Sequence, residues 1–390
     1  MMKEPSSTPK TKKGNPILRL LALLVTLALM LAALALVVHR DRLNLDALER
    51  WLNYRKLETL ETGEVEPFTH AGGDQLSLAR LDKGILFSSA SGAHYYSLSG
   101  EVYAEEVLSM DHPVLASSDR AGVVYDAGGQ SLFLFQEGAE TFDLAVEGNS
   151  DLLSARVNDA GWLAVTAQQS GYKGAVTVYN NKGEKIIQIS LSSTFAVDAA
   201  LSPDGKTVAV VTIDQSAGRF RSQILFYPIN RTEPSATVDL GDLLVLDLDF
   251  ESEQLWLLTD DQVLTLSPDG KELGRWSFAQ SYLKGCSLKG DGFACLLLGN
   301  YETGGADRIL TLSPSCQPLG QMQLTGQVLD FDCAGSYASL LTGTDLTIYN
   351  SALIPYAQLE DPQGARYTCI RDDGSAVLAD HQRCWLFIPD

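Results

Sequence analysis

The stretch Ser154-Ala155-Arg156-Val157-Asn158-Asp159-Ala160-Gly161-Trp162-Leu163-Ala164-Val165 decides the fold. Two short apolar runs flank the sequence Asn-Asp-Ala-Gly. Gly adopts a positive φ at little cost, and Asn and Asp side chains hydrogen-bond the backbone nearby, so this combination favours a tight turn. The stretch therefore predicts two antiparallel strands, with the small residue Ala155 in the first of them.

The same pattern recurs along the chain at intervals of about forty residues, the period of four-stranded propeller blades. The eight unit starts are Leu78–Asp82, Leu115–Asp119, Ser154–Asn158, Asp198–Ser202, Asp247–Phe250, Gly285–Leu288, Asp330–Cys333 and Thr368–Arg371. Turn sequences such as Pro203-Asp204-Gly205, Gly290-Asp291-Gly292 and Asp373-Gly374 follow the first strand of their units. The prediction is an all-β, eight-bladed β-propeller over residues 63–390. Seven blades with one irregular insertion is the second alternative, and a pair of β-sandwiches is the third.

The ends of the repeat region predict how the ring closes. The last unit, Ala365–Pro389, has room for only three strands, whereas Gly63–Phe68 precedes the first unit and has an extended pattern. We expect this early segment to supply the missing outer strand. Such a closure would leave only short, protected sheet edges.

An apolar segment precedes the repeats. Leu20–Val38 is an unbroken run in which Thr26 is the only polar side chain. As a helix it would span about 28 Å, close to the thickness of a bilayer core. We therefore predict a transmembrane helix over residues 17–39. A cleaved signal peptide is the alternative, although its apolar stretch is normally about 7–15 residues.

Charge predicts the orientation of that segment. Before it lie five basic residues and one acidic residue, whereas the whole chain carries a net charge of −20. Short loops rich in Lys and Arg stay on the cytoplasmic side. We predict a single-pass protein of the cell membrane, with a disordered cytoplasmic tail over residues 1–16 and an extracytoplasmic C-terminal domain.

A juxtamembrane stalk over residues 40–62 includes a predicted helix, Asn44–Glu58. Leu45, Leu48 and Leu52 lie on one helical stripe with Trp51 beside it. Two interpretations stay open. The helix packs against the outer domain, or it lies at the level of the lipid headgroups, where Trp and basic side chains are common.

Parts of the chain resemble a known family. The matching stretches are Pro113-Val114, Val124–Leu132, Ala155–Val165, Gly171–Lys173 and Val176–Tyr179. They are similar to a Firmicutes family of membrane-anchored, single-pass β-propeller proteins of unknown function, with a repeat architecture of the WD40 and quinoprotein type. The resemblance covers the anchor, the stalk and about the first half of the propeller. It implies the same topology and no activity.

The chain carries few signs of catalysis. Its five His residues show no pair with the spacing of a helical zinc site, and no Cys-x-x-Cys, Walker loop or Gly-x-Ser-x-Gly motif occurs. Asp126 with Gly128-Gly129 is interpreted as a turn rather than a phosphate loop. First strands line a propeller channel, so Asp247, Asp249, Asp330 and Asp332 are weak candidates for calcium ligands, with a solvated channel wall as the alternative. We predict no cofactor and no enzyme.

All six Cys residues lie in the predicted propeller: Cys286, Cys295, Cys316, Cys333, Cys369 and Cys384. Cys286 and Cys295 flank a turn, so we expect them to face each other across a hairpin. A disulfide between them and two buried free thiols are equally compatible with the sequence.

Composition limits the function. The acidic balance excludes a nucleic-acid partner, which requires a basic face. The expected function is a binding or scaffolding platform that the membrane anchor displays in the cell envelope, with envelope proteins as partners. The alternative is an extracytoplasmic hydrolase or lyase with carboxylates at the channel mouth, which predicts a pocket holding at least two carboxylates of raised pKa.

Overall fold

The computed structural model describes residues 23, 26, 30, 45–73, 75–145, 150–216 and 218–389. The chain divides into two units, one ending at Tyr54 and one beginning at Arg55. Within the described part of the first unit lies helix α2 (Leu45–Tyr54), which is shorter than the predicted Asn44–Glu58.

The predicted transmembrane segment over residues 17–39 and the predicted tail over residues 1–16 lie outside the described residues, apart from Leu23, Thr26 and Met30. Among the described residues, none of the helices combines the length and the apolar character that crossing a membrane requires.

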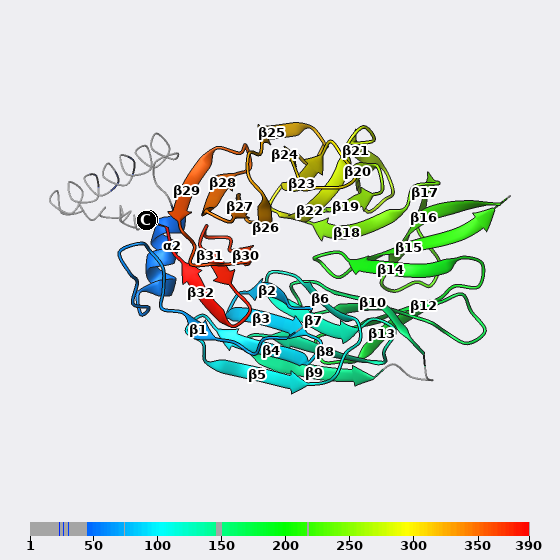
Figure 1. Ribbon diagram of the computed structural model, residues 1–390. Helices are drawn as coiled ribbons and strands as arrows, with labels where there is room; N and C mark the ends of the chain where they lie inside the picture. Colours follow the sequence, from blue (N-terminus) through cyan, green and yellow to red (C-terminus); the bar gives the residue numbers. More distant parts are fainter. Residues whose placement is uncertain are drawn as a thin grey trace, which may run out of the picture. The chain divides into compact units, whose positions relative to one another are not determined.

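The second unit consists of eight four-stranded antiparallel sheets, called blades 1 to 8 (Figure 1). Blades 1 to 4 contain β2 (Ser77–Leu81), β3 (Gly84–Ser89), β4 (Gly92–Ser97) and β5 (Val102–Val107); β6 (Pro113–Ser117), β7 (Ala121–Asp126), β8 (Ser131–Gln136) and β9 (Ala139–Ala145); β10 (Leu152–Val157), β11 (Leu163–Ala167), β12 (Ala175–Tyr179) and β13 (Lys185–Ser190); β14 (Phe195–Leu201), β15 (Thr207–Ser216), β16 (Arg219–Pro228) and β17 (Ala236–Gly241).

Blades 5 to 7 repeat the same order. They contain β18 (Val245–Glu251), β19 (Gln254–Thr259), β20 (Gln262–Leu266) and β21 (Glu272–Ser277); β22 (Tyr282–Gly290), β23 (Phe293–Gly299), β24 (Arg308–Leu312) and β25 (Pro318–Gln323); β26 (Val328–Ala334), β27 (Tyr337–Thr342), β28 (Asp345–Asn350) and β29 (Pro355–Glu360). Blade 8 combines β30 (Tyr367–Ile370), β31 (Ala376–Ala379) and β32 (Arg383–Phe387) with β1 (Phe68–Thr69) from the beginning of the unit.

The blades form a closed ring. The first strand of each blade lies beside the first strands of both neighbours, and β30 lies beside β2. These eight inner strands therefore surround a central channel, and the prediction of an eight-bladed propeller is confirmed over the seven-bladed alternative.

The predicted closure is also confirmed. Phe68 pairs with Cys384 and Thr69 with Arg383. Upstream of them, the Val65 amide donates to the Leu386 carbonyl at 2.8 Å, and the Ile388 amide donates to the Gly63 carbonyl at the same distance. The segment that precedes blade 1 thus completes blade 8.

The hydrophobic core is divided into layers between adjacent blades. One cluster joins Leu257 and Leu264 of blade 5 to Phe226 of blade 4, and another joins Trp385 of blade 8 to Ile348 of blade 7.

The predicted first turns adopt positive φ at Gly161 (74°), Gly205 (67°), Gly292 (70°) and Gly374 (79°). Only glycine adopts such angles without strain, which is why these four positions mark the hairpins so clearly.

Candidate functional site

Bulges near the start of the inner strands position side chains in the channel wall. The pairing of the first and second strands skips one residue in each of blades 3 to 7, and the residue after the skip is Ser154, Asp198, Asp247, Gly285 or Asp330. The three aspartates each accept a hydrogen bond from the amide of the next residue, at 2.8–2.9 Å. Since a bulge leaves backbone groups without ladder partners, these contacts hold both the bulge and the carboxylate in place.

Arg156 joins three blades. From β10 its guanidinium donates to both Asp198 oxygens, to Asp247 Oδ1 at 2.8 Å and to the Leu248 carbonyl at 2.7 Å. Burial of Arg156 disfavours its charge, but the carboxylates of Asp198 and Asp247 outweigh burial and raise its pKa above the usual value. The contacts therefore act as a brace between blades 3, 4 and 5.

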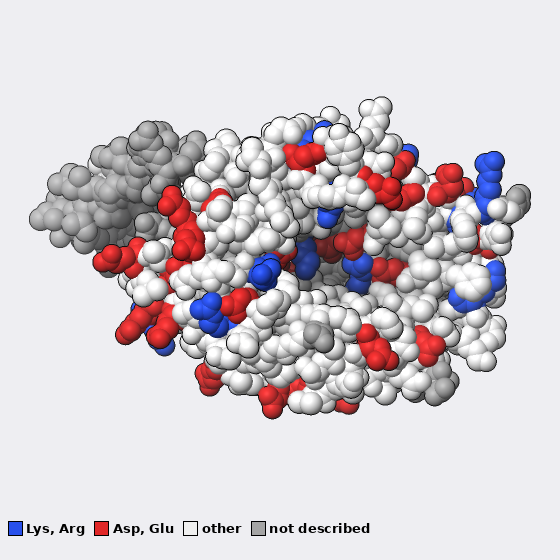
Figure 2. Space-filling model, in the orientation of Figure 1, with Lys and Arg blue, Asp and Glu red and all other residues white. Residues whose placement is uncertain are grey.

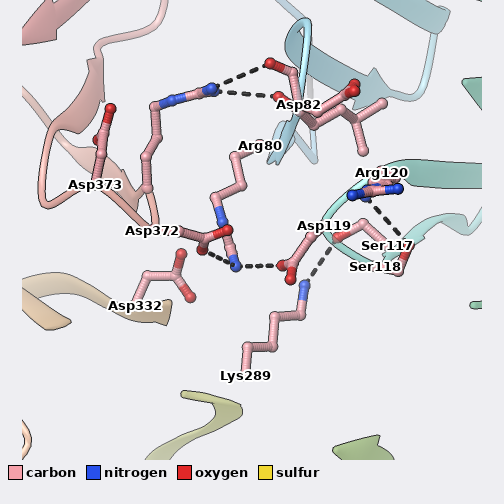
Figure 3. A network of polar contacts seen from close by, with 12 residues as sticks. Arg80, Asp82, Ser117, Ser118, Asp119, Arg120, Lys289, Asp332, Asp372 and Asp373 are labelled. Atoms are coloured by element: carbon pink, nitrogen blue, oxygen red, sulfur yellow. Dashed lines mark hydrogen bonds and ion pairs between the residues drawn. The ribbon is translucent and has the colours of Figure 1, made fainter. Parts of the chain in front are cut away.

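Arg80 forms a second brace. This side chain is buried, and its Nη2 lies 2.5 Å from Asp119 Oδ1 on blade 2 and 3.1 Å from Asp372 Oδ1 on blade 8 (Figure 3). Burial raises the pKa of Asp119 to about 6, and Arg80 offsets part of that effect. Nearby, Arg371 donates to the carbonyls of Leu81 and Asp82, which also ties blade 8 to blade 1.

Lys289 crosses the channel. From β22 in blade 6 its Nζ donates to Ser117 Oγ in blade 2 at 2.8 Å (Figure 3). Three cavities of about 330, 290 and 260 Å³ occupy the channel, and Lys289 lines each of them. In Figure 2, charged side chains of both signs gather around the hollow at the centre of the propeller.

Several carboxylates that line the cavity of about 290 Å³ have raised pKa values. It is lined by Asp249, Asp119 and Asp291, together with Lys289. Burial raises the pKa of Asp249 to about 7, although Lys289 and Arg156 offset part of the effect, and burial and Asp372 raise the pKa of Asp291. With a pKa of about 7, the Asp249 carboxyl is half protonated near neutral pH and can exchange protons, which is the chemistry that an acid–base site needs.

The four calcium candidates have different surroundings. Asp247 pairs with Arg156, and Asp330 accepts hydrogen bonds from the Phe331 and Thr368 amides. Asp249 lines the two cavities of about 330 and 290 Å³, and Asp332 lies 3.4 Å from Ser287 Oγ. Among the residues that the structure describes, no group of three or more His, Cys, Asp or Glu side chains is arranged to hold a metal ion.

The six cysteines are free thiols. The expectation that Cys286 faces Cys295 is wrong, because Ser287 pairs with Cys295 and Cys286 pairs with Leu296. A shift of one residue places the two side chains on opposite faces of the sheet. Cys286 accordingly packs between blades 5 and 6, and Cys295 packs between blades 6 and 7 beside Cys333.

The segment after β7 forms a turn. Gly128 adopts a φ of 87° between β7 and β8, and Asp126 Oδ1 accepts a hydrogen bond from the His112 amide, so the turn interpretation of this segment is confirmed. Sequence reasoning missed the three cations of the channel, Arg80, Arg156 and Lys289. The signal was present, since each is a basic residue within a repeated first strand whose neighbours are apolar or small.

The two ends of the channel differ. Inner strands run parallel, as the bridge between Gly290 and Gly335 shows for blades 6 and 7. We call the end where these strands begin the loop face; the loops between second and third strands reach it too. Exposed large apolar side chains on the loop face of blades 3 to 6 are Leu153, Tyr172, Phe195, Phe220, Leu244, Leu246, Tyr282 and Tyr301. The opposite end, the turn face, carries Asp119, Asp159, Glu251 and Asp291 around the cavity of about 290 Å³.

A family model of unknown function, DUF5711, matches residues 53–353. The chain belongs to the DUF5711 family. None of the curated proteins matches it at a significant level. The match covers the stalk end, blades 1 to 6 and the first three strands of blade 7, so membership supports the fold and assigns no activity to it.

Solved structures are similar in fold. The C-terminal WD40 domain of Sif2 is 13% identical with a TM-score of 0.58, covering 86% of this chain and 99% of that one. The computationally designed protein Ika8 is 11% identical with a TM-score of 0.56, covering 85% and 98%. A eukaryotic initiation factor is 11% identical with a TM-score of 0.52, covering 81% and 84%. At these identities the likeness concerns the fold alone.

Proposed function

We propose that this DUF5711 protein is a non-enzymatic binding platform, anchored by its N-terminal apolar segment in the cell membrane, with the propeller outside the cytoplasm. The apolar run Leu20–Val38 and the basic residues before it support the anchor and its orientation. The partner class that fits best is another protein of the cell envelope.

The exposed apolar side chains of the loop face carry this proposal. Phe220 and Tyr301 are 72% and 75% exposed, and Phe195 is 53% exposed. Single exposed apolar residues are common, but eight on four neighbouring blades of one face are typical of a contact surface. Aromatic residues are enriched where proteins bind one another, because they bury a large area with few rotatable bonds.

Cations beside the aromatic rings support the same interpretation. Lys173 Nζ lies 4.9 Å from the centre of the Phe195 ring and donates to the Ser193 carbonyl at 2.7 Å. Lys284 Nζ lies 6.0 Å from the centre of the Tyr282 ring and donates to the Glu302 carbonyl. Lys173 links two loops, and Lys284 links β22 to the loop between β23 and β24. These contacts hold the aromatic rings in defined positions and lower the entropy cost of binding.

The test is site-specific photocrosslinking in native membranes with the full-length protein. A photoreactive amino acid replaces Phe195 on the loop face, and in a matched control it replaces Ile354, which is 60% exposed in the turn between β28 and β29. We expect discrete adducts from the probe at position 195 and, in a separate protein, from a probe at position 282. The double variant F195E/F220E with the probe at position 282 should no longer form the second adduct. Equal adducts from positions 195 and 354, or none from either, would overturn the proposal.

One observation favours a second candidate, a hydrolase or lyase at the channel mouth. The cavity of about 290 Å³ holds Asp249 and Asp119, whose pKa values burial raises to about 7 and about 6. This meets the condition of two carboxylates of raised pKa in one pocket. Asp119 is however bound to Arg80, which leaves Asp249 as the acid–base residue. A substrate screen in which D249N abolishes turnover supports this candidate, and turnover unaffected by D249N excludes it.

A further inference from the structure

Helix α2 exposes its apolar side and buries polar groups. Leu48, Trp51 and Leu52, which lie on one helical face at spacings of three and four, are 56%, 62% and 52% exposed. On the other side, Arg50 and Tyr54 are only 2% and 5% exposed. A helix on the surface of a water-soluble protein normally has the reverse arrangement, with its apolar stripe covered and its charged residues in water.

We propose that the face formed by Leu48, Trp51 and Leu52 lies in the headgroup region of a lipid bilayer, with Trp51 as its anchor. The inference rests on the proposed function, since it needs the preceding segment to be in the membrane. It goes further by assigning a lipid contact to three named side chains outside the apolar run.

The position of the helix in the sequence supports this occupant. The apolar run ends at Val38 and α2 begins at Leu45, so six residues separate them. Fully extended, six residues reach only about 20 Å. A helix tied to the bilayer by so short a connection stays within reach of the headgroups, and an exposed apolar face there meets lipid before it meets a distant partner.

The chemistry of the flanking residues also fits lipid. Arg40 and Arg42 precede the helix in sequence, and Arg55 and Lys56 follow it with exposed side chains. Basic residues on both sides suit anionic headgroups. Trp favours the membrane–water interface because its ring is largely apolar while its indole N–H requires a polar partner. An interfacial amphipathic helix has this combination of a basic border and an apolar face that contains Trp.

The test uses quenching of Trp fluorescence by brominated lipid. Full-length protein is reconstituted into vesicles of phosphatidylethanolamine and phosphatidylglycerol, with acyl chains brominated near the headgroup in one set and near the chain end in another. The chain has five Trp residues, and the other four, Trp162, Trp256, Trp276 and Trp385, belong to the propeller. We expect quenching that is stronger with bromine near the headgroup, that disappears in W51F, and that persists in the matched control W276F.

Two further results separate the possible failures. If the protein does not float with the vesicles, the anchor fails, and this inference fails with it. If the protein floats but the fluorescence of W51F is quenched as much as that of the wild type, the membrane anchor is supported and the lipid contact of α2 is excluded. A Trp51 that brominated lipid cannot reach, with L48E/L52E converting an oligomer into monomers, would assign the face to a second copy instead. In the supporting case L48E/L52E loses the quenching and keeps the thermal unfolding of the propeller.

Discussion

Lys289 Nζ and Ser117 Oγ form a 2.8 Å hydrogen bond between blades 6 and 2, which are opposite each other in the ring of eight. Most contacts between blades join neighbours, whereas this one crosses the channel. Arg80 links blades 8, 1 and 2, and Arg156 links blades 3, 4 and 5. The channel is thus braced by three cations set among carboxylates, which gives its charged residues a structural role whatever the propeller binds.

Replacing Lys289 by Met should destabilise the propeller in a pH-dependent way. The variant loses one hydrogen bond and removes the cation that lowers the pKa of Asp249 most, at a cost of about 1 kcal/mol near pH 8. At pH 5 the loss should be smaller, because Asp249, with a pKa of about 7, is then mostly protonated. Urea unfolding of the full-length protein at the two pH values measures the difference.

The control for this prediction is S117A, which removes the acceptor and keeps the cation. Its loss should be similar at pH 5 and pH 8, because the hydroxyl of Ser117 does not titrate in this range. If K289M and S117A respond identically to pH, Lys289 contributes through its hydrogen bond alone.

The D249N variant should be more stable than the wild type above pH 7. The folded-state pKa of about 7 lies above the usual 3.8, so the folded protein resists ionisation of Asp249. The resulting penalty is absent below about pH 4, grows as the pH rises from 4 to 7, and is complete above 7. We expect D249N to gain on the order of 1–2 kcal/mol at pH 8 and nothing at pH 4, after allowance for solvent in the channel. A gain that is independent of pH would contradict this account.

Replacing Arg156 should lower the free energy of unfolding, and part of that loss should be recovered by a second cation or by neutralising its acidic partners. The R156M variant leaves the carboxylates of Asp198 and Asp247 facing each other in a partly buried site, at a cost of about 2–3 kcal/mol. R156K should recover only part of it, since an ammonium cannot donate to both carboxylates and the Leu248 carbonyl in the same planar geometry. The triple variant R156M/D198N/D247N should unfold at a temperature closer to the wild type than R156M does. An equally unstable triple variant would show that packing of the Arg156 side chain matters more than its charge.

The propeller architecture could be predicted from the sequence, because turn residues and the spacing of the repeats can be recognised without knowing which strands contact each other. Gly161, Gly205 and Gly374 mark hairpins that need positive φ, and the segment Gly63–Phe68 follows from counting strands in the last unit. The bulges could not be predicted this way. The skipped residues Leu153 and Leu246 are apolar, like the residue before each of them, so the sequence gives no sign that the strand pairing skips them.

The candidate site depends on strand register and on contacts between distant blades, which the sequence pattern does not reveal. The register error at Cys286 and Cys295 amounted to a single residue, yet it moved the two thiols to opposite sides of a blade. The partners of Arg156 lie in two other blades, 42 and 91 residues away, so only the curvature of the closed ring brings them together. Aspartates were recognised as residues of the channel, whereas the cations that neutralise them were not.

Glu64 stabilises the contact that closes the ring at blade 8. This buried carboxylate accepts a 3.0 Å hydrogen bond from Trp385 Nε1 in β32, and others from Gln363 Nε2 and Thr62 Oγ1. E64A leaves the buried indole N–H of Trp385 without an acceptor, which costs about 2 kcal/mol. E64Q keeps an acceptor oxygen and should lose less than half as much.

Hydrogen exchange locates the effect of E64A. The amides of Val65 and Ile388, which donate across the closure, should exchange faster in E64A than in the wild type, while amides of blades 3 to 5 keep the wild-type rates under conditions where local opening dominates. Because a ring opens most easily where its two chain ends meet, protection lost there first would identify blade 8 as the point at which unfolding begins. Loss of protection spread evenly over all blades would mean instead that Glu64 stabilises the propeller only as a whole.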